Sequence, residues 1–158
     1  MDRSSKETLT QEPLMVKEFI STFSASLDPR LWINLVIEEI EELEEALLAE
    51  DPEGILKEMS DLMYVTLGFN MVAAGAEQLA LMPQEEHTEY VELLNTVGLR
   101  HQEAIDFFSK PVNFYEAFRR VHMSNMSKLD SDGKPIKRDD GKILKSENYK
   151  PAELGDLV

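Results

Sequence analysis

Two groups of acidic residues have a spacing that can place several carboxylates on one side of a helix. Glu38, Glu39 and Glu42 lie in the segment LVIEEIEELEEAL, and Glu58 and Asp61 lie in LKEMSDLMYV. At about 100° per residue, Glu58 and Asp61 are roughly 60° apart on a helix that is otherwise strongly apolar. A carboxylate that points toward an apolar core is costly unless a partner compensates its charge.

The two acidic groups are expected to meet in the folded chain. Their helices are separated only by the short connection at residues 51–54, so they should run antiparallel and adjacent. Converging carboxylates repel one another, and hard divalent cations with oxygen ligands remove this repulsion. We therefore predict a Mg²⁺ or Mn²⁺ site with two or three ions. Its candidate ligands are Glu38, Glu39, Glu42, Glu58 and Asp61.

A di-iron helical bundle is an alternative metal site, but it needs Glu-x-x-His pairs. The residues three positions before the histidines are Gln84, Gly98 and Arg119, none of which is acidic. An all-oxygen site favours Mg²⁺ or Mn²⁺ and hence phosphate chemistry. Either acidic group alone would also suit a solvated helix face. Asp61, on an apolar face, favours the metal interpretation.

Helical periodicity dominates the chain and predicts an all-α fold with a four-helix-bundle core and one extra helix. Asp-Pro at Asp28 and Asp51 has the form of an N-cap followed by a proline in the first turn. Asn113 and Glu116 have the spacing of a capping box. The helices are expected over residues 14–26, 29–49, 52–74, 90–108 and 114–127.

The C-terminal segment, residues 129–158, differs from the helical body. Its two Asp-Gly signals predict turns, in a loop with a short hairpin. Residues 1–109 hold 6 Lys/Arg and 23 Asp/Glu, a charge of −17, whereas residues 110–158 hold 10 and 8, a charge of +2. This asymmetry suits a solvated surface, or a cation site in the body with an anion-binding tail. We divide the chain into a polar N-terminal tail (1–13), an all-α domain (14–128) and its basic, phosphate-facing tail (129–158).

Composition excludes several classes of function. The net charge of −15 argues against a nucleic-acid partner. The chain has no cysteine, which excludes disulfides, zinc–thiolate sites and thiol catalysis and is compatible with a reducing compartment. The N-terminal residues lack the apolar core of a signal peptide, and no apolar stretch is long enough to span a membrane. We expect a cytoplasmic protein (in the host cytoplasm, if viral) without a membrane partner.

The acidic motifs and the tail together resemble the MazG-type all-α NTP pyrophosphatases and the phosphoribosyl-ATP-pyrophosphohydrolase-like proteins. The motif EExxE begins at Glu38, ExxD begins at Glu58, and the sequence SNMSK begins at Ser124. The resemblance runs from about residue 19 to residue 151. It implies a MazG-like bundle that cleaves a nucleoside triphosphate between its α- and β-phosphates. The products would be a monophosphate and pyrophosphate, and the nucleophile a metal-activated water.

The resemblance also implies roles for individual residues. Metal ligands are matched by Glu39, Glu42, Glu58 and Asp61. Glu38 matches a residue that activates the attacking water or holds a further ion. Phosphate contacts are matched by Asn125 and Lys128, and the part of the tail that closes over the triphosphate holds Lys145 and Tyr149. Separately, Asn34 lies one turn before Glu38 and is a candidate to bind the base, whereas Trp32 and His122 are better explained as core residues.

Two alternatives to a (d)NTP pyrophosphohydrolase stay open. One is a related enzyme that acts on dUTP/dUDP or phosphoribosyl-ATP. The other is a non-catalytic helical module that senses nucleotides or binds a partner. Residues 52–74 are apolar around most of the helix, and residues 90–108 add a further apolar surface. Surfaces of this kind, and the resemblance, predict a homo-oligomer, a dimer or a tetramer.

Overall fold

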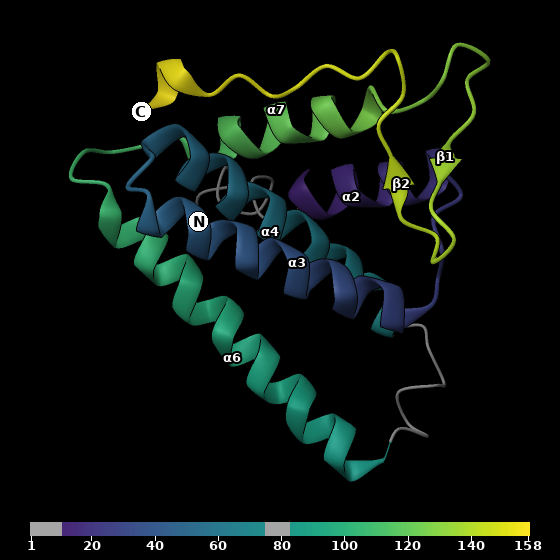
Figure 1. Cartoon of the computed structure of the whole chain (residues 1–158), viewed down its shortest axis with the longest axis horizontal. Helices are drawn as coiled ribbons and strands as arrows, with labels where there is room; N and C mark the ends of the chain where they lie inside the picture. The colour runs from purple at the N-terminus through teal and green to yellow at the C-terminus, as the bar shows by residue number, and fades with distance from the viewer. Residues whose placement is uncertain (1–10, 75–82) are drawn as a thin grey trace, which may run out of the picture.

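Helix α4 (Pro52–Ala74) lies at the centre of the fold. It packs against α2 (Gln11–Thr22), α3 (Pro29–Leu48), α6 (Gln84–Phe107) and α7 (Phe114–Met126) (Figure 1). The computed structural model describes residues 11–74 and 83–158. Within these residues, strands β1 (Ile136–Lys137) and β2 (Ile143–Leu144) form one small sheet. A short 3₁₀ helix, η1 (Gly155–Leu157), is the last element. The all-α class predicted from the sequence is confirmed.

The α3–α4 pair carries both acidic motifs, and a tight connection fixes its geometry. At the start of α3, Asp28 accepts a hydrogen bond from the Arg30 N–H (3.0 Å), with Pro29 in the first turn. At its end, Glu50 adopts a φ of 49°, and the Asp51 N–H donates to the Ala46 carbonyl (3.3 Å). This hydrogen bond across a left-handed residue closes the helix and lets α4 start at once. Both Asp-Pro start signals are therefore confirmed.

The apolar surface of α4 is largely covered within this one chain. Its Leu62 and Phe69 pack in a cluster with residues of α3, whereas Tyr64 packs in a second cluster with α2 and α7. A Cβ at Gly68 would lie 2.2 Å from the Trp32 ring, so the glycine is what allows the indole to lie directly on the α4 backbone. The other four described helices therefore cover most of α4. From the sequence, part of its apolar surface was expected to lie in a subunit interface.

Two helix boundaries differ from the predicted ones. The first helix spans Gln11–Thr22 instead of 14–26, because Ser24 adopts a φ of 46° and the Ala25 N–H donates to the Ile20 carbonyl (3.0 Å). No glycine marks this end in the sequence. Helix α6 begins at Gln84 and not near residue 90. Residues 83–89 are all exposed, so the first turns of α6 carry no apolar periodicity.

The predicted hairpin is present in the tail. Strands β1 and β2 pair antiparallel, and the turn between them includes Gly141, with a φ of 97°. Ile143 of β2 is only 8% exposed and packs against Phe19 and Phe23 of the α2 region. Lys137 also donates from Nζ to the Ser24 carbonyl (2.7 Å). The hairpin is therefore docked on the helices by both apolar and polar contacts.

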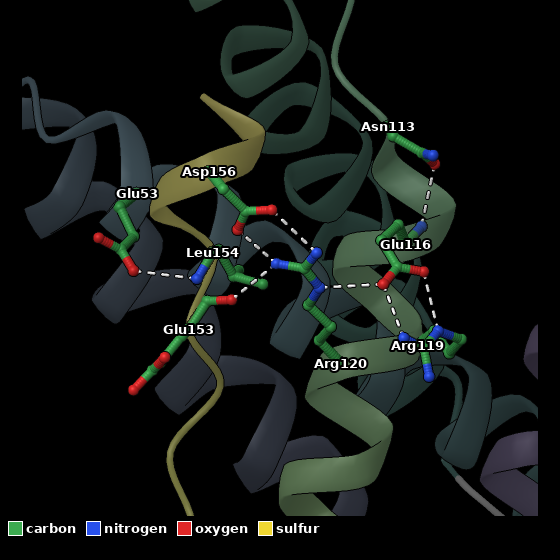
Figure 2. Close-up of polar contacts among 8 residues, drawn as sticks. All are labelled: Glu53, Asn113, Glu116, Arg119, Arg120, Glu153, Leu154 and Asp156. Carbon is green, nitrogen blue, oxygen red and sulfur yellow. Dashed lines mark hydrogen bonds and ion pairs between the residues drawn. The ribbon is translucent and has the colours of Figure 1, made fainter.

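The end of the chain is held by a group of ion pairs that we call the tail clamp, formed by Glu116, Arg119, Arg120 and Asp156 (Figure 2). Arg120 donates to Glu116 and, through two nitrogens, to Asp156. The C-terminal segment runs alongside α7 (Figure 1), and its Leu154 N–H donates to Glu53 near the start of α4 (3.0 Å) (Figure 2).

The predicted capping box at the start of α7 is half formed. The Asn113 side chain accepts from the Glu116 N–H (3.0 Å), but the Glu116 carboxylate binds Arg119 and Arg120 instead of reaching back. Within the described ranges, no helix is long and apolar enough to cross a membrane. Most of the predicted polar tail (1–13), and residues 75–82 between α4 and α6, lie outside the described residues.

Candidate active site

Three carboxylates from two adjacent helices meet at the α3–α4 interface. Glu39 comes from α3, and Glu58 and Asp61 come from successive turns of α4. One oxygen of each lies within 4.8 Å of the others. We call these three residues the acidic cluster. The predicted convergence of the two motifs therefore does occur in the fold.

Two oxygens of the acidic cluster lack a partner. Glu39 Oε2 and Glu58 Oε2 are buried and accept no hydrogen bond from any residue that the structure describes. Burial and the charge of Asp61 raise the pKa of Glu39 to about 9. The same two causes raise the pKa of Glu58 to about 7. Hard divalent cations bind carboxylate oxygens as ligands. A cluster with buried, unpaired carboxylate oxygens therefore fits Mg²⁺ or Mn²⁺.

Lys57 is the cation that the sequence analysis missed. Its Nζ donates to Glu58 Oε1 (2.9 Å) and to Asp61 Oδ2 (3.0 Å). Burial lowers the pKa of this ammonium, but Asp61 and Glu58 outweigh that effect and raise it above its ordinary value. The signal was present in the sequence, because a lysine four residues before an aspartate on a helix can pair with it.

The acidic cluster borders a cavity of about 360 Å³ whose walls come from α2, α3, α4, α7 and the tail. One part of the wall is polar and includes Glu39, Glu42, Asp61, Asn125, Tyr149 and the lysines Lys57, Lys128, Lys142 and Lys145. The other part is apolar and includes Phe19, Leu31, Trp32, Leu35, Val65 and Leu144. A ligand that carries both anionic and apolar groups matches this mixed lining.

Lys128 faces the carboxylates from the end of α7. Burial lowers its pKa, while the charges of Asp61 and Glu39 oppose that change. Lys145 directly follows β2, with its Nζ 4.9 Å from the centre of the Tyr149 ring. Four of the predicted substrate-binding residues line the same cavity: the phosphate-contact candidates Asn125 and Lys128, and Lys145 and Tyr149 of the tail. Their role itself stays a prediction.

Glu38 and Glu39 are neighbours in sequence but have different surroundings. Glu38 accepts hydrogen bonds from Lys142 (2.5 Å) and Arg138 (3.2 Å) of the hairpin, and it is outside both the acidic cluster and the cavity wall. Burial would raise the pKa of Glu38, but these two cations lower it below its ordinary value. Its predicted role as a catalytic base or metal ligand is not tested by these contacts.

Three other predicted residues are placed as follows. Glu42 lines the cavity but is not one of the three clustered carboxylates. Asn34 is exposed and does not line the cavity. Trp32 is 2% exposed and forms part of the apolar wall, with its Nε1 donating to the Ser26 carbonyl (2.8 Å). The Trp32 N–H is therefore committed to the fold, and only its ring face is left for a ligand.

His122 is a core residue, as the sequence indicated. It is 5% exposed, and its Nδ1 is hydrogen-bonded to the Tyr64 hydroxyl (2.9 Å). Its Nε2 lies 3.3 Å from Glu18, and burial lowers its pKa. The ring therefore holds α7 against α2 and α4.

The site therefore belongs to an all-α fold. Carboxylates suited to a divalent cation and several lysines lie around one cavity. Residues 7–77 match the family model described as phosphoribosyl-ATP pyrophosphohydrolase, over slightly less than half of the 158-residue chain. The match spans α2, α3 and α4 and includes the whole acidic cluster, which confirms the family resemblance seen in the motifs. It supports a pyrophosphohydrolase, a hydrolase of phosphorus anhydrides, as the class of activity. Neither the curated proteins nor the solved structures gave a significant match.

Proposed function

We propose that this protein is a Mg²⁺- or Mn²⁺-dependent nucleoside triphosphate pyrophosphohydrolase. It cleaves a (d)NTP between the α- and β-phosphates to give (d)NMP and pyrophosphate. The observation that carries the proposal is the pair of buried, unpaired oxygens on Glu39 and Glu58, beside a cavity lined with lysines. The family match over the same helices supports the type of bond that is cleaved.

The acidic cluster would hold the metal, with Glu42 at its edge. Bound Mg²⁺ or Mn²⁺ supplies charge neutralisation for the phosphates and activates water for attack. The protein residues fix the position of the phosphates, which is the larger part of catalysis in phosphoryl transfer. Two or three ions per site remain the predicted number, and calorimetric stoichiometry with Mn²⁺ in the presence of nucleotide measures it.

The lysines of the cavity would neutralise the phosphate oxygens that the metal does not reach. Lys128 is half-buried and feels the charges of Asp61 and Glu39, so it suits the phosphates next to the metal. Lys145 is exposed and comes from the tail, so it suits the outer part of the triphosphate. The apolar residues around Trp32 would bind the base. Contacts with the ring of the base and with backbone groups would then select it, and the exposed Asn34 would not.

Phosphoribosyl-ATP is the second candidate substrate, because the description of the matching family names it. Its hydrolysis would use the same metal and the same lysines, and only the group beyond the α-phosphate would differ. dUTP and dUDP belong in the same comparison.

The test is direct. The purified protein is incubated with each NTP, each dNTP, dUDP and phosphoribosyl-ATP, with Mg²⁺ or Mn²⁺, and the products are separated. Monophosphate and pyrophosphate in equal amounts, formed only with metal and absent in Glu39→Gln, are expected. Orthophosphate release from a triphosphate would contradict the assigned bond, and binding without turnover would favour the nucleotide-sensing module.

The homo-oligomer also stays a proposal, and α6 now supports it better than α4 does. Val91, Leu99 and Ile105 of α6 are 53%, 63% and 43% exposed, whereas most of α4 is covered within the chain. A dimer or tetramer is expected in light scattering at low micromolar concentration. A mass of 18.0 kDa with full activity would contradict it.

A further inference from the structure

Lys57 contacts two of the three carboxylates of the acidic cluster. Its Nζ lies 2.9 Å from Glu58 Oε1 and 3.0 Å from Asp61 Oδ2. The candidate metal ligands on α4 are thus paired with a cation that the chain itself provides. Glu39, the member of the cluster on α3, has a buried oxygen with no partner among the described residues.

A divalent ion and the Lys57 ammonium need the same carboxylate lone pairs. Glu58 and Asp61 side chains are only 15% and 18% exposed, so few orientations are open to them. The Lys57 side chain is 36% exposed and lines the cavity, so its flexible stem has room to move. Lysine is a compact point charge on four rotatable bonds, which makes it a counter-ion that can leave.

We propose that Lys57 acts as a built-in counter-ion that neutralises the acidic cluster in the metal-free protein and is displaced into the cavity when the metal binds. The inference rests on the proposed metal site but goes beyond it. In the metal-free state, the lysine stabilises two carboxylates that would otherwise repel each other. In the metal-bound state, the released ammonium faces the space proposed for the phosphates.

If the metal displaces Lys57, removal of this lysine should have opposite effects on the stability of the metal-free protein and on its affinity for the metal. Without Lys57, the metal-free protein should be less stable, because the repulsion among the carboxylates is no longer screened. The metal should bind more tightly, because it no longer has to break two charged hydrogen bonds. If Lys57 had a purely structural role, its removal would weaken both the folding stability and the metal binding. The two measurements together therefore show whether Lys57 competes with the metal for the carboxylates.

The experiment compares wild type with Lys57→Met and with Lys57→Arg as the charge-retaining control. In Lys57→Met, the melting temperature without metal should fall, and the dissociation constant for Mn²⁺ alone, measured by calorimetry, should tighten roughly three- to tenfold. This range reflects a charged hydrogen bond that is partly screened by solvent. Lys57→Arg should stay close to wild type in both. An unchanged or weaker Mn²⁺ affinity in Lys57→Met would overturn the proposal.

A second measurement uses the wild-type protein, in case Lys57→Met does not fold. Reductive methylation of lysines, followed by peptide mass spectrometry, should show Lys57 protected without metal and several-fold more reactive with saturating Mg²⁺. Exposed Lys110 serves as the internal reference. Equal Lys57 reactivity with and without Mg²⁺ would contradict displacement. Absence of Mn²⁺ binding to wild type would overturn the metal site itself, whereas binding that ignores Lys57 would overturn only this inference.

Discussion

The acidic cluster and the tail clamp use the same residue types in opposite ways. In the tail clamp, Glu116 is half-buried and binds two arginines, and its pKa falls to about 2 because Arg119 and Arg120 stabilise its charge. In the acidic cluster, Glu39 has a buried, unpaired Oε2 and lies beside other carboxylates, and its pKa rises to about 9. One carboxylate is satisfied by the fold, and the other is left without a partner in it.

This difference separates a carboxylate that holds the structure from one that awaits a ligand. An ion pair on the surface fastens the chain and contributes little else. A buried, unpaired carboxylate destabilises the fold, and proteins keep such groups mainly where a function needs them. Adjacent residues of α3 repeat the contrast, since cations of the hairpin lower the pKa of Glu38 while burial raises that of Glu39.

The largest effect is expected from Glu39→Gln. The substitution preserves volume and removes one metal-binding charge, so turnover should fall more than about a hundredfold, beyond the loss caused by removing an outer-sphere partner of a metal. Without metal, the melting temperature should rise near neutral pH, because the fold disfavours the ionised form of Glu39 and glutamine has no such form. Steady-state rates and thermal melts measure both effects. Glu45→Gln, at an exposed position of the same helix, is the control and should change neither.

A smaller effect is expected from Lys128→Ala. A charged hydrogen bond to phosphate contributes about 1.5–3 kcal/mol, so the triphosphate should bind roughly ten- to a hundredfold more weakly. Mn²⁺ binding without nucleotide should change little in a calorimetric titration. Lys134→Ala, at an exposed position of the tail, is the matched control. If Lys128→Ala lost Mn²⁺ affinity as strongly as nucleotide affinity, the lysine would be supporting the acidic cluster and not the phosphates.

Glu38→Gln distinguishes the two adjacent glutamates. Because Glu38 binds Lys142 and Arg138, its loss should loosen the hairpin that forms one wall of the cavity and raise KM a few-fold. Mn²⁺ affinity measured without nucleotide should stay near the wild-type value. A loss of Mn²⁺ affinity comparable to that of Glu39→Gln would instead support the role as metal ligand that the sequence motif predicts.

The smallest effect on activity is expected in the tail clamp. The folded-state pKa of Glu116 is lowered, so its pairing stabilises the protein above the ordinary glutamate value of 4.5 and is lost as pH falls toward 2. Glu116→Gln should therefore melt at a lower temperature than wild type near pH 6, with unchanged kcat. The difference in melting temperature should shrink between pH 4.5 and pH 2. A difference that persists unchanged at the acid end would mean that packing, and not charge, holds the tail.

The parts of this fold that the sequence predicts are those determined locally. The Asp-Pro signals located the starts of α3 and α4, and the short connection brought Glu39 to Glu58 and Asp61. The end of α2 was missed because Ser24 adopts a left-handed conformation that normally marks a glycine. The start of α6 was missed because its first turns bury no apolar residue.

The candidate site could likewise be predicted only where local helical spacing determines it. Which glutamates face the cavity depends on the path of the tail, and helical spacing alone cannot show that Lys142 reaches Glu38. The Lys57–Asp61 pair is the exception, because its spacing of four residues is visible in the sequence.

The central claim is that the acidic cluster binds the divalent cation on which hydrolysis depends. The most direct measurement is anomalous diffraction from a crystal grown with Mn²⁺ and a non-hydrolysable triphosphate. The account predicts a Mn²⁺ peak bounded by Glu39, Glu58 and Asp61, with the triphosphate in the adjoining cavity. A well-ordered triphosphate in that cavity, with Mn²⁺ bound elsewhere and the acidic cluster still paired with Lys57, would contradict it.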